Sequence, residues 1–252
     1  MNNVICNRRP TRVAKGFTQV ELLVIVAVVG VLAMVGISGA RKWSNQSKIA
    51  QCSNNLRQLN MSQLLYGADN LDNLPSINPG GANWLWDTPV SVTSTFLRYG
   101  VATNMMYCPG TSPRFTDAQN FASSQSLWNF GVPTIRLLGY ALSLAGPSLL
   151  NPTNRNTTTV PQPMTIGGVV IPAPLPSQRV LTADAILTTG GGNFTSIFGG
   201  YTYNGVSYPH LCPHLDGNYP AGGNVAMLDG HVEWRPFQQM SVRTTSLPSF
   251  YW

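Results

Sequence analysis

A long apolar segment near the amino terminus sets the strongest limit on the fold. From Leu22 to Ile37 every residue is apolar or Gly, and the run continues with a single Ser to Ala40. This length corresponds to about 28 Å of α-helix, close to the hydrocarbon thickness of a bilayer. Because no face of the segment is polar, we predict a helix surrounded by lipid or by other apolar helices over residues 17–40.

The positive charge of the chain is concentrated ahead of this segment. The first sixteen residues contain no acid, and their four basic residues are Arg8, Arg9, Arg12 and Lys15. Beyond them, eleven basic residues are balanced by nine acidic ones, so the composition does not favour nucleic-acid binding. Basic residues ahead of an apolar helix favour a cytoplasmic amino terminus. We therefore predict a single-pass protein of the cytoplasmic (inner) membrane, whose residues 41–252 form a periplasmic or extracellular domain.

The junction between the basic and apolar regions carries a specific motif. Residues 15–18 (Lys-Gly-Phe-Thr), followed by Glu21 and the apolar run, resemble the class III signal of type IV pilins and pseudopilins. The resemblance implies that residues 1–16 are a leader. A prepilin peptidase would remove it after Gly16 and methylate the new amino terminus at Phe17. The implied partners are other pilin or pseudopilin subunits and an inner-membrane assembly platform.

Glu21 would have a defined partner in such an assembly. A carboxylate inside an apolar helix is unfavourable unless it lies near the interface or meets an opposite charge. Cleavage after Gly16 would create a free amine on Phe17, which the Glu21 carboxylate of a neighbouring subunit could neutralise. Three other interpretations of the amino terminus remain open: a secretory signal cut near residues 38–40, a twin-arginine signal, and a plain single-pass anchor.

The pattern becomes amphipathic after residue 42. Residues recur at steps of three or four and share one helical stripe, namely Ile49, Cys52, Leu56, Leu59 and Tyr66, with Gln63 in the gap between the last two. No Pro occurs between residues 17 and 66, so we predict one continuous helix of about fifty residues. Its second half would pack on a small antiparallel sheet, with Cys52 as a small core residue.

Short elements separated by turns follow this helix. Residues 139–144 are strand-like and residues 179–187 have the pattern of a buried strand. The Pro-rich residues 147–178 are predicted to form an exposed loop or a loosely attached hairpin. Asp229-Gly230 lies between two strand-like runs and predicts a hairpin with a two-residue type I′ turn.

A second resemblance includes this hairpin. Together with residues 52–59 and 107–109, it is similar to a group of pseudopilin-like proteins, abundant in Planctomycetes and Verrucomicrobia, that end in the motif H-x9-D-G. His214 departs from the motif, because fourteen residues separate it from Asp229. The resemblance covers the two ends of the chain and hardly any of its middle.

The sequence offers weak metal sites and no catalytic motif. The candidates for zinc are His210, Cys212 and His214, which alternate as residues on one face of a strand do. Oxygen ligands for calcium would come from Asp216, Asn218 and Asp229. Neither set is regular enough to predict a cofactor. Because nucleophile and phosphate-binding motifs are also missing, we predict a protein without enzymatic activity.

The cysteines and tryptophans give little further information about the function. Three cysteines follow the leader, Cys52, Cys108 and Cys212, so at most one intramolecular disulfide can form, and its pairing stays open. Trp84 and Trp86 alternate like strand neighbours and could form a sugar-stacking surface, although core packing is the commoner role for such residues.

These features predict an α+β, pilin-like fold: a long amino-terminal helix, transmembrane in its first half, packed on a small antiparallel β-sheet. The expected function is that of a structural subunit of a type IV pilus-like filament or a type II secretion pseudopilus, without a cofactor. The alternative is a membrane-tethered extracytoplasmic module that binds a glycan or a metal and uses the pilin-like start only for targeting.

Overall fold

The computed structural model describes most of the chain, with several gaps. Described are Gly16 and residues 18–77, 84–111, 120–121, 126–129, 132–197, 202–203, 206–207 and 211–252, without the side chains of 33–42 and with only the backbone of 202–203 and 206–207. The chain divides into two compact units, Met1–Ser44 and Asn45–Trp252. The strands of the described residues all belong to the second unit.

Helices are few, and strands are numerous and short. The helices named among the described residues are α1 (Gln19–Asp69) and α2 (Val90–Arg98), with 3-10 turns η1 (Thr103–Met106), η2 (Pro109–Thr111), η3 (Pro152–Asn154), η4 (Pro176–Gln178) and η5 (Phe237–Gln239). The first seven strands are β1 (Asp87–Pro89), β2 (Ile135–Leu137), β3 (Tyr140–Leu142), β4 (Met164–Ile166), β5 (Val169–Ile171), β6 (Val180–Asp184) and β7 (Ile186–Thr188). The others are β8 (Thr202–Tyr203), β9 (Val206–Ser207), β10 (Leu215–Asp216), β11 (Tyr219–Pro220), β12 (Gly222–Met227), β13 (Val232–Pro236) and β14 (Ser249–Tyr251).

Helix α1 covers the segment in which a helix was predicted. It begins at Gln19 and continues for 51 residues to Asp69, and no Pro interrupts it. Beyond its end, Leu71 and Asp72 have positive φ values of 54° and 62°, a left-handed conformation that cannot continue a right-handed helix.

The predicted transmembrane segment requires correction. No helix in the described part of the chain is long and apolar enough to cross a membrane. The predictions of a transmembrane helix over residues 17–40, and of a single-pass inner-membrane protein with a periplasmic or extracellular domain, are therefore wrong.

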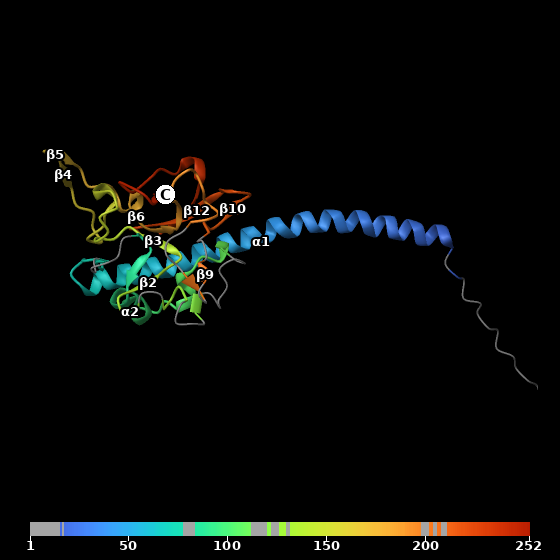
Figure 1. Ribbon diagram of the computed structural model, residues 1–252, viewed down its shortest axis with the longest axis horizontal. Coiled ribbons are helices and arrows are strands. Elements are labelled where there is room, and N and C mark those ends of the chain that lie inside the picture. Colours follow the sequence, from blue (N-terminus) through green and yellow to red (C-terminus); the bar gives the residue numbers. More distant parts are fainter. Residues whose placement is uncertain are drawn as a thin grey trace, which may run out of the picture. The chain divides into compact units, whose positions relative to one another are not determined.

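The main sheet has four antiparallel strands in the order β13-β12-β6-β3. β12 pairs with both β13 and β6, and β6 also pairs with β3. Figure 1 shows β3, β6 and β12 beside the later turns of α1. The sheet therefore brings strands from the middle and the end of the sequence against the helix.

Alternate residues of the sheet belong to two hydrophobic clusters. On one face, Tyr140 and Leu142 of β3 pack in a cluster with Leu56 and Leu59 of α1. Between them in sequence, Ala141 belongs to the cluster on the opposite face. This alternation follows from the two-residue period of a strand, and it buries the apolar stripe of α1 that the sequence predicted.

Polar side chains on the same part of α1 also contact the sheet. Gln63 Nε2 donates a hydrogen bond to Thr182 Oγ1 at 2.7 Å, and Asn60 Nδ2 donates to the Met227 carbonyl oxygen at 2.7 Å. Because these donors are buried, the bonds fix which side of the helix meets the strands.

The prediction of one small sheet is also wrong. Among the described residues there are five further two-stranded sheets, β1-β2, β4-β5, β7-β14, β8-β9 and β10-β11. Their strands are only two or three residues long, because Gly, Pro and other turn residues interrupt the chain, so they do not extend the main sheet. The β4-β5 hairpin occupies part of the Pro-rich residues 147–178, and the whole of β5 is exposed.

Candidate metal centre and the predicted sites

The amino-terminal motif lies only partly within the described residues. Gly16 is exposed, and Phe17 falls outside the described residues. Thr18 and Glu21 form a capping box at the start of α1. Glu21 Oε2 accepts hydrogen bonds from the Thr18 backbone N–H and hydroxyl, both at 2.8 Å, and Thr18 Oγ1 accepts one from the Glu21 N–H at 3.3 Å. Glu21 thus has a local role in starting the helix.

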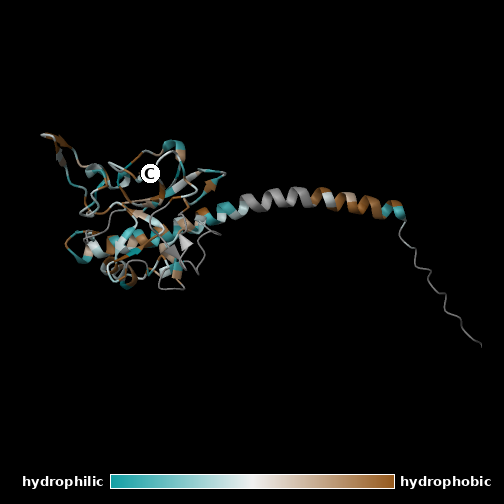
Figure 2. Ribbon diagram, in the orientation of Figure 1, coloured by the Kyte–Doolittle hydropathy of each residue, from teal (hydrophilic) through white to brown (hydrophobic). Residues whose placement is uncertain are grey.

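These hydrogen bonds also favour the ionised form of Glu21. They lower the pKa of its carboxyl group, and the bond from the Thr18 backbone N–H contributes most. A negative charge in the first turn also interacts favourably with the helix dipole. Figure 2 shows this polar start, followed by the hydrophobic turns of α1.

The hairpin predicted at Asp229-Gly230 is present, but its turn differs from the prediction. The Gly230 N–H donates to the Met227 oxygen at 2.9 Å, and the Met227 N–H donates to the His231 oxygen at 2.8 Å. Of residues 228–230, Gly230 alone has a positive φ, 95°. A type I′ turn requires two such residues, so the predicted two-residue turn is wrong, and a three-residue loop ending in a left-handed Gly joins the strands.

The side chains of the predicted zinc set lie in different surroundings. His210 is outside the described residues. Cys212 is buried beside Leu187, whose backbone oxygen accepts from its Sγ at 3.1 Å and whose N–H donates to its Sγ at 3.2 Å. His214 has a positive φ of 55°, which breaks the strand-like alternation assumed for residues 210–214.

His214 belongs instead to a buried cluster of four potential metal ligands. The other members are Cys52, Cys108 and Asp184, and one ligand atom from each lies within 4.8 Å of all the others. The Cys52 Sγ lies 3.0 Å from the Cys108 Sγ and 2.8 Å from Asp184 Oδ1. The His214 Nε2 lies 3.3 Å from the Cys108 Sγ and 3.4 Å from Asp184 Oδ2. We call these four residues the Cys-Cys-Asp-His cluster.

Four separate segments supply this cluster. Cys52 lies on the buried stripe of α1, and Asp184 is the last residue of β6. Cys108 lies between η1 and η2, and His214 immediately precedes β10. All four residues are 9% exposed or less. Because the segments are far apart in sequence, only the packing of the second unit brings the four side chains together.

Neighbouring groups hold the cluster in place. Asn224 of β12 donates its backbone N–H to Asp184 Oδ2 at 2.7 Å, and the Gly110 N–H donates to the Cys108 Sγ at 3.3 Å. A Cβ added to Gly110 would lie 2.7 Å from the His214 ring, so a larger residue does not fit without moving the imidazole. The carboxylate and one sulfur therefore have fixed backbone donors.

Burial and mutual contact determine the charges in the cluster. Burial raises the pKa of the Cys108 thiol well above its usual value, and its hydrogen bond to Cys52 adds to this shift. Burial alone would raise the pKa of Asp184, but hydrogen bonds from His214, Cys52 and Asn224 outweigh it and the pKa is lowered. Burial alone would lower the pKa of His214, but its contacts with Asp184 and Cys52 raise it to about 10. The bare cluster thus holds an imidazolium–carboxylate pair beside the sulfur atoms.

Three of the four cluster residues lie in stretches that the sequence analysis had singled out. Cys52 and Cys108 lie in the two stretches that resemble the pseudopilin-like group, and His214 belongs to the predicted zinc set. Asp184 has no motif around it. The sequence feature that could have identified it is a single acidic residue at the end of an apolar strand, because a charged residue is buried there only if it is paired.

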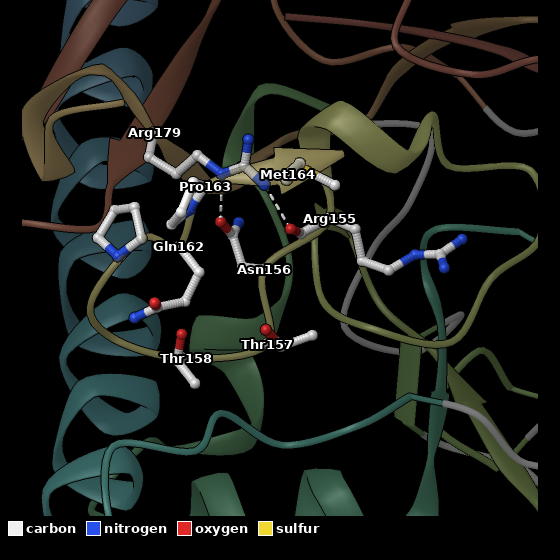
Figure 3. Close-up of a pocket in the computed structure, with 9 residues that line it drawn as sticks. Arg155, Asn156, Thr157, Thr158, Gln162, Pro163, Met164 and Arg179 are labelled. Atoms are coloured by element: carbon white, nitrogen blue, oxygen red, sulfur yellow. Dashed lines mark hydrogen bonds between the residues drawn. The ribbon is translucent and has the colours of Figure 1, made fainter. Parts of the chain in front are cut away.

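A cavity of about 200 Å³ lies at the Pro-rich segment (Figure 3). Arg179 forms one wall of it. The Arg179 Nε donates to Asn156 Oδ1 at 2.6 Å, and its terminal nitrogens donate to the backbone oxygens of Thr153 and Arg155. Because the guanidinium already donates to three acceptors on one loop, its geometry indicates a role in holding that loop.

The glycan and calcium candidates find little support in the geometry. Trp86 is only 4% exposed; it stacks on Trp84 at 5.3 Å and meets the Phe250 ring edge-on at 5.8 Å. Core packing therefore accounts for Trp86. Asp216 and Asp229 do not share a group of potential ligands in the described part of the chain.

Two sulfurs, one imidazole and one carboxylate around a single point are a chemically specific arrangement, but they do not define a family. Comparison with known proteins gives no assignment either. No family model, no curated protein and no solved structure matches this chain.

Proposed function

We propose that this chain is a structural subunit that is cleaved by a prepilin peptidase between Gly16 and Phe17. It then assembles through α1 with other pilin-like subunits, as in a type IV pilus-like filament or a pseudopilus. The observation that carries the proposal is the exposure of the apolar start of α1. Leu22 and Leu32, for example, are 59% and 66% exposed. A continuous exposed apolar surface is typical of an interaction site.

The form of this surface favours several partners over one. Every residue from Leu22 to Leu32 is apolar or Gly, and all of them are exposed. A single partner helix would cover one stripe and leave the opposite face in water. Identical copies of α1 can surround one another, since each presents the same surface, and repeated contacts between identical subunits build a filament when they do not close into a ring.

From residue 45 onward, α1 has a different surface. Cys52, Leu56 and Leu59 are fully buried within the second unit, whereas Arg57 and Gln58 are exposed. This part of the helix already has its apolar partner in the main sheet. The division supports an assembling segment at residues 19–32 and a folding segment from residue 45 onward.

Glu21 adds a charge requirement to the assembly. Packing of apolar helices would remove its ionised carboxylate from water, which is unfavourable without an opposite charge. Cleavage after Gly16 creates an amine on Phe17, and the amine of a neighbouring subunit would supply that charge. The proposal therefore links processing to assembly.

The test is the amino-terminal mass of the mature chain and its state of assembly. Protein isolated from cells that contain a prepilin peptidase should begin at Phe17 with a methylated amine, and it should sediment as filaments visible by electron microscopy. A mature chain that begins at Met1, or that stays monomeric after cleavage at Phe17, would contradict the proposal.

Gly16 offers a clean variant for the processing step. A Cβ at Gly16 or at Gly30 would meet no atom within 4 Å, so neither substitution strains the fold. Gly16→Val should block cleavage because it changes the residue that the peptidase recognises, whereas Gly30→Val should be cleaved normally. Equal cleavage of both variants would show that the signal is not read at Gly16.

A further inference from the structure

We propose that Cys52, Cys108, Asp184 and His214 bind one zinc ion, which ties α1 to the main sheet. The proposal is independent of filament assembly, because all four residues lie within the second unit. It concerns a different set from the alternating residues 210–214, with which it shares only His214. Its basis is the geometry and the donor chemistry of the Cys-Cys-Asp-His cluster.

The spacing of the donor atoms fits a tetrahedral ion. With Zn–S bonds of about 2.3 Å and Zn–N or Zn–O bonds of about 2.0–2.1 Å, neighbouring donors stand about 3.3–3.8 Å apart. The observed separations are 2.8 Å from the Cys52 Sγ to Asp184 Oδ1, 3.0 Å between the two sulfurs, 3.3 Å from the Cys108 Sγ to the His214 Nε2, and 3.4 Å from that nitrogen to Asp184 Oδ2. Outward shifts of a few tenths of an ångström would therefore bring the donors to zinc distances.

The donor types favour zinc over the hard cations. Thiolate and imidazole are ligands for zinc and other soft or borderline metals, whereas calcium and magnesium prefer oxygen donors alone. Four protein ligands complete a tetrahedron and leave no open position for water or substrate, which is the pattern of structural zinc sites. The burial of all four residues agrees with a structural role.

The groups around the cluster suit a metal site. The Gly110 N–H at 3.3 Å from the Cys108 Sγ would stabilise a thiolate, and the Asn224 N–H at 2.7 Å from Asp184 Oδ2 would orient the carboxylate. Such outer contacts to the ligands are a regular feature of metal centres. A divalent ion would also offset two of the three negative charges of two thiolates and a carboxylate, none of which is stable alone in a buried site.

Two other states of the cluster would give different experimental results. One is a disulfide between Cys52 and Cys108, which needs the sulfurs at about 2.05 Å, whereas they stand 3.0 Å apart. The other is a network of hydrogen-bonded thiols beside the pair of His214 and Asp184. The disulfide would lower the mass of the chain by two hydrogens, and the thiol network would leave both cysteines free and hold no metal.

The experiment measures metal content in the full chain, purified without a metal-affinity tag and without chelator. Elemental mass spectrometry should find close to one zinc per chain, and native mass spectrometry should show both cysteines reduced. Cys108→Ser should lose zinc affinity by more than the roughly 10–100-fold that follows removal of an outer contact. The matched control is Cys212→Ser, which removes a buried cysteine outside the cluster and should keep its zinc.

A second measurement does not depend on the folding of a variant. Wild-type protein treated with a strong chelator under reducing conditions should melt at a lower temperature, and zinc but not magnesium should restore the original value. Cobalt in place of zinc should give the visible absorption of a tetrahedral thiolate site. Wild-type protein without zinc, an intact Cys52–Cys108 disulfide, or a melting temperature unchanged by the chelator would each overturn the proposal.

Discussion

Cys52 shows how a single residue can serve the core and a polar site together. It lies on the apolar stripe of α1 and is fully buried, as a small core residue should be. Its sulfur nevertheless contacts the Asp184 carboxylate at 2.8 Å and the Cys108 sulfur at 3.0 Å. A hydropathy pattern records only the burial of such a side chain, since cysteine behaves as a small hydrophobic residue until a partner defines its chemistry.

Glu21, at the start of α1, also has two roles, because its carboxylate caps the helix and carries a negative charge. Glu21→Gln keeps an oxygen that can accept from the Thr18 N–H, but it removes the charge. Thr18→Val removes the hydroxyl of the cap and keeps the carboxylate. If assembly requires charge pairing, Glu21→Gln should reduce filament yield by roughly tenfold or more while Thr18→Val stays close to wild type. Quantitative sedimentation of the processed chains measures the yield, and a Glu21→Gln variant that assembles normally would leave only the capping role.

At the scale of elements, the Pro-rich segment is more ordered than its composition indicates. Residues 147–178 contain two 3-10 turns and the β4-β5 hairpin. Arg179, immediately after the segment, donates to Asn156 Oδ1 and to two backbone oxygens of the same loop. A planar guanidinium can reach several acceptors at once, which explains how one side chain can hold several parts of a loop together.

Arg179→Lys tests this contribution. Lysine keeps the positive charge but cannot reproduce the fork of donors, so the variant should lose about 1–3 kcal/mol of unfolding free energy and its loop should be cleaved faster by protease. Arg57→Lys, at an exposed position on α1, is the matched control and should change neither quantity. Thermal unfolding and limited proteolysis measure the two effects. Equal behaviour of the two variants would show that Arg179 does not hold the loop.

For the whole molecule, the second half of α1 and the main sheet form one folding unit. Leu56 and Leu59 have no exposed surface and belong to the same cluster as Tyr140 and Leu142 of β3. The polar bonds of Asn60 and Gln63 to the sheet act on the same side of the helix. The stability of the second unit should therefore depend strongly on this contact.

Leu59→Ala should make that dependence measurable. Deleting a fully buried leucine side chain typically costs about 2–5 kcal/mol, because the surroundings close the cavity only in part. Leu65→Ala, on the same helix but 45% exposed, should stay within about 0.5 kcal/mol of wild type. Denaturant unfolding of both variants gives the difference in free energy, and a small effect of Leu59→Ala would mean that α1 contributes little to the stability of this unit.

The local sequence determined the features that depend on neighbouring residues: the extent of α1, its buried stripe at Leu56 and Leu59, and the hairpin at Asp229-Gly230. Each follows from side-chain periodicity or from the conformational freedom of Gly. The membrane prediction was wrong because no helix in the described part of the chain is long and apolar enough to cross a membrane. The prediction of a single sheet was wrong because short strands pair with partners that the sequence does not identify. Only the tertiary structure decided that Cys52, Cys108, Asp184 and His214 meet. These residues lie far apart in the sequence, and the packing of α1 on the sheet brings them together. No local sequence pattern predicts such a contact.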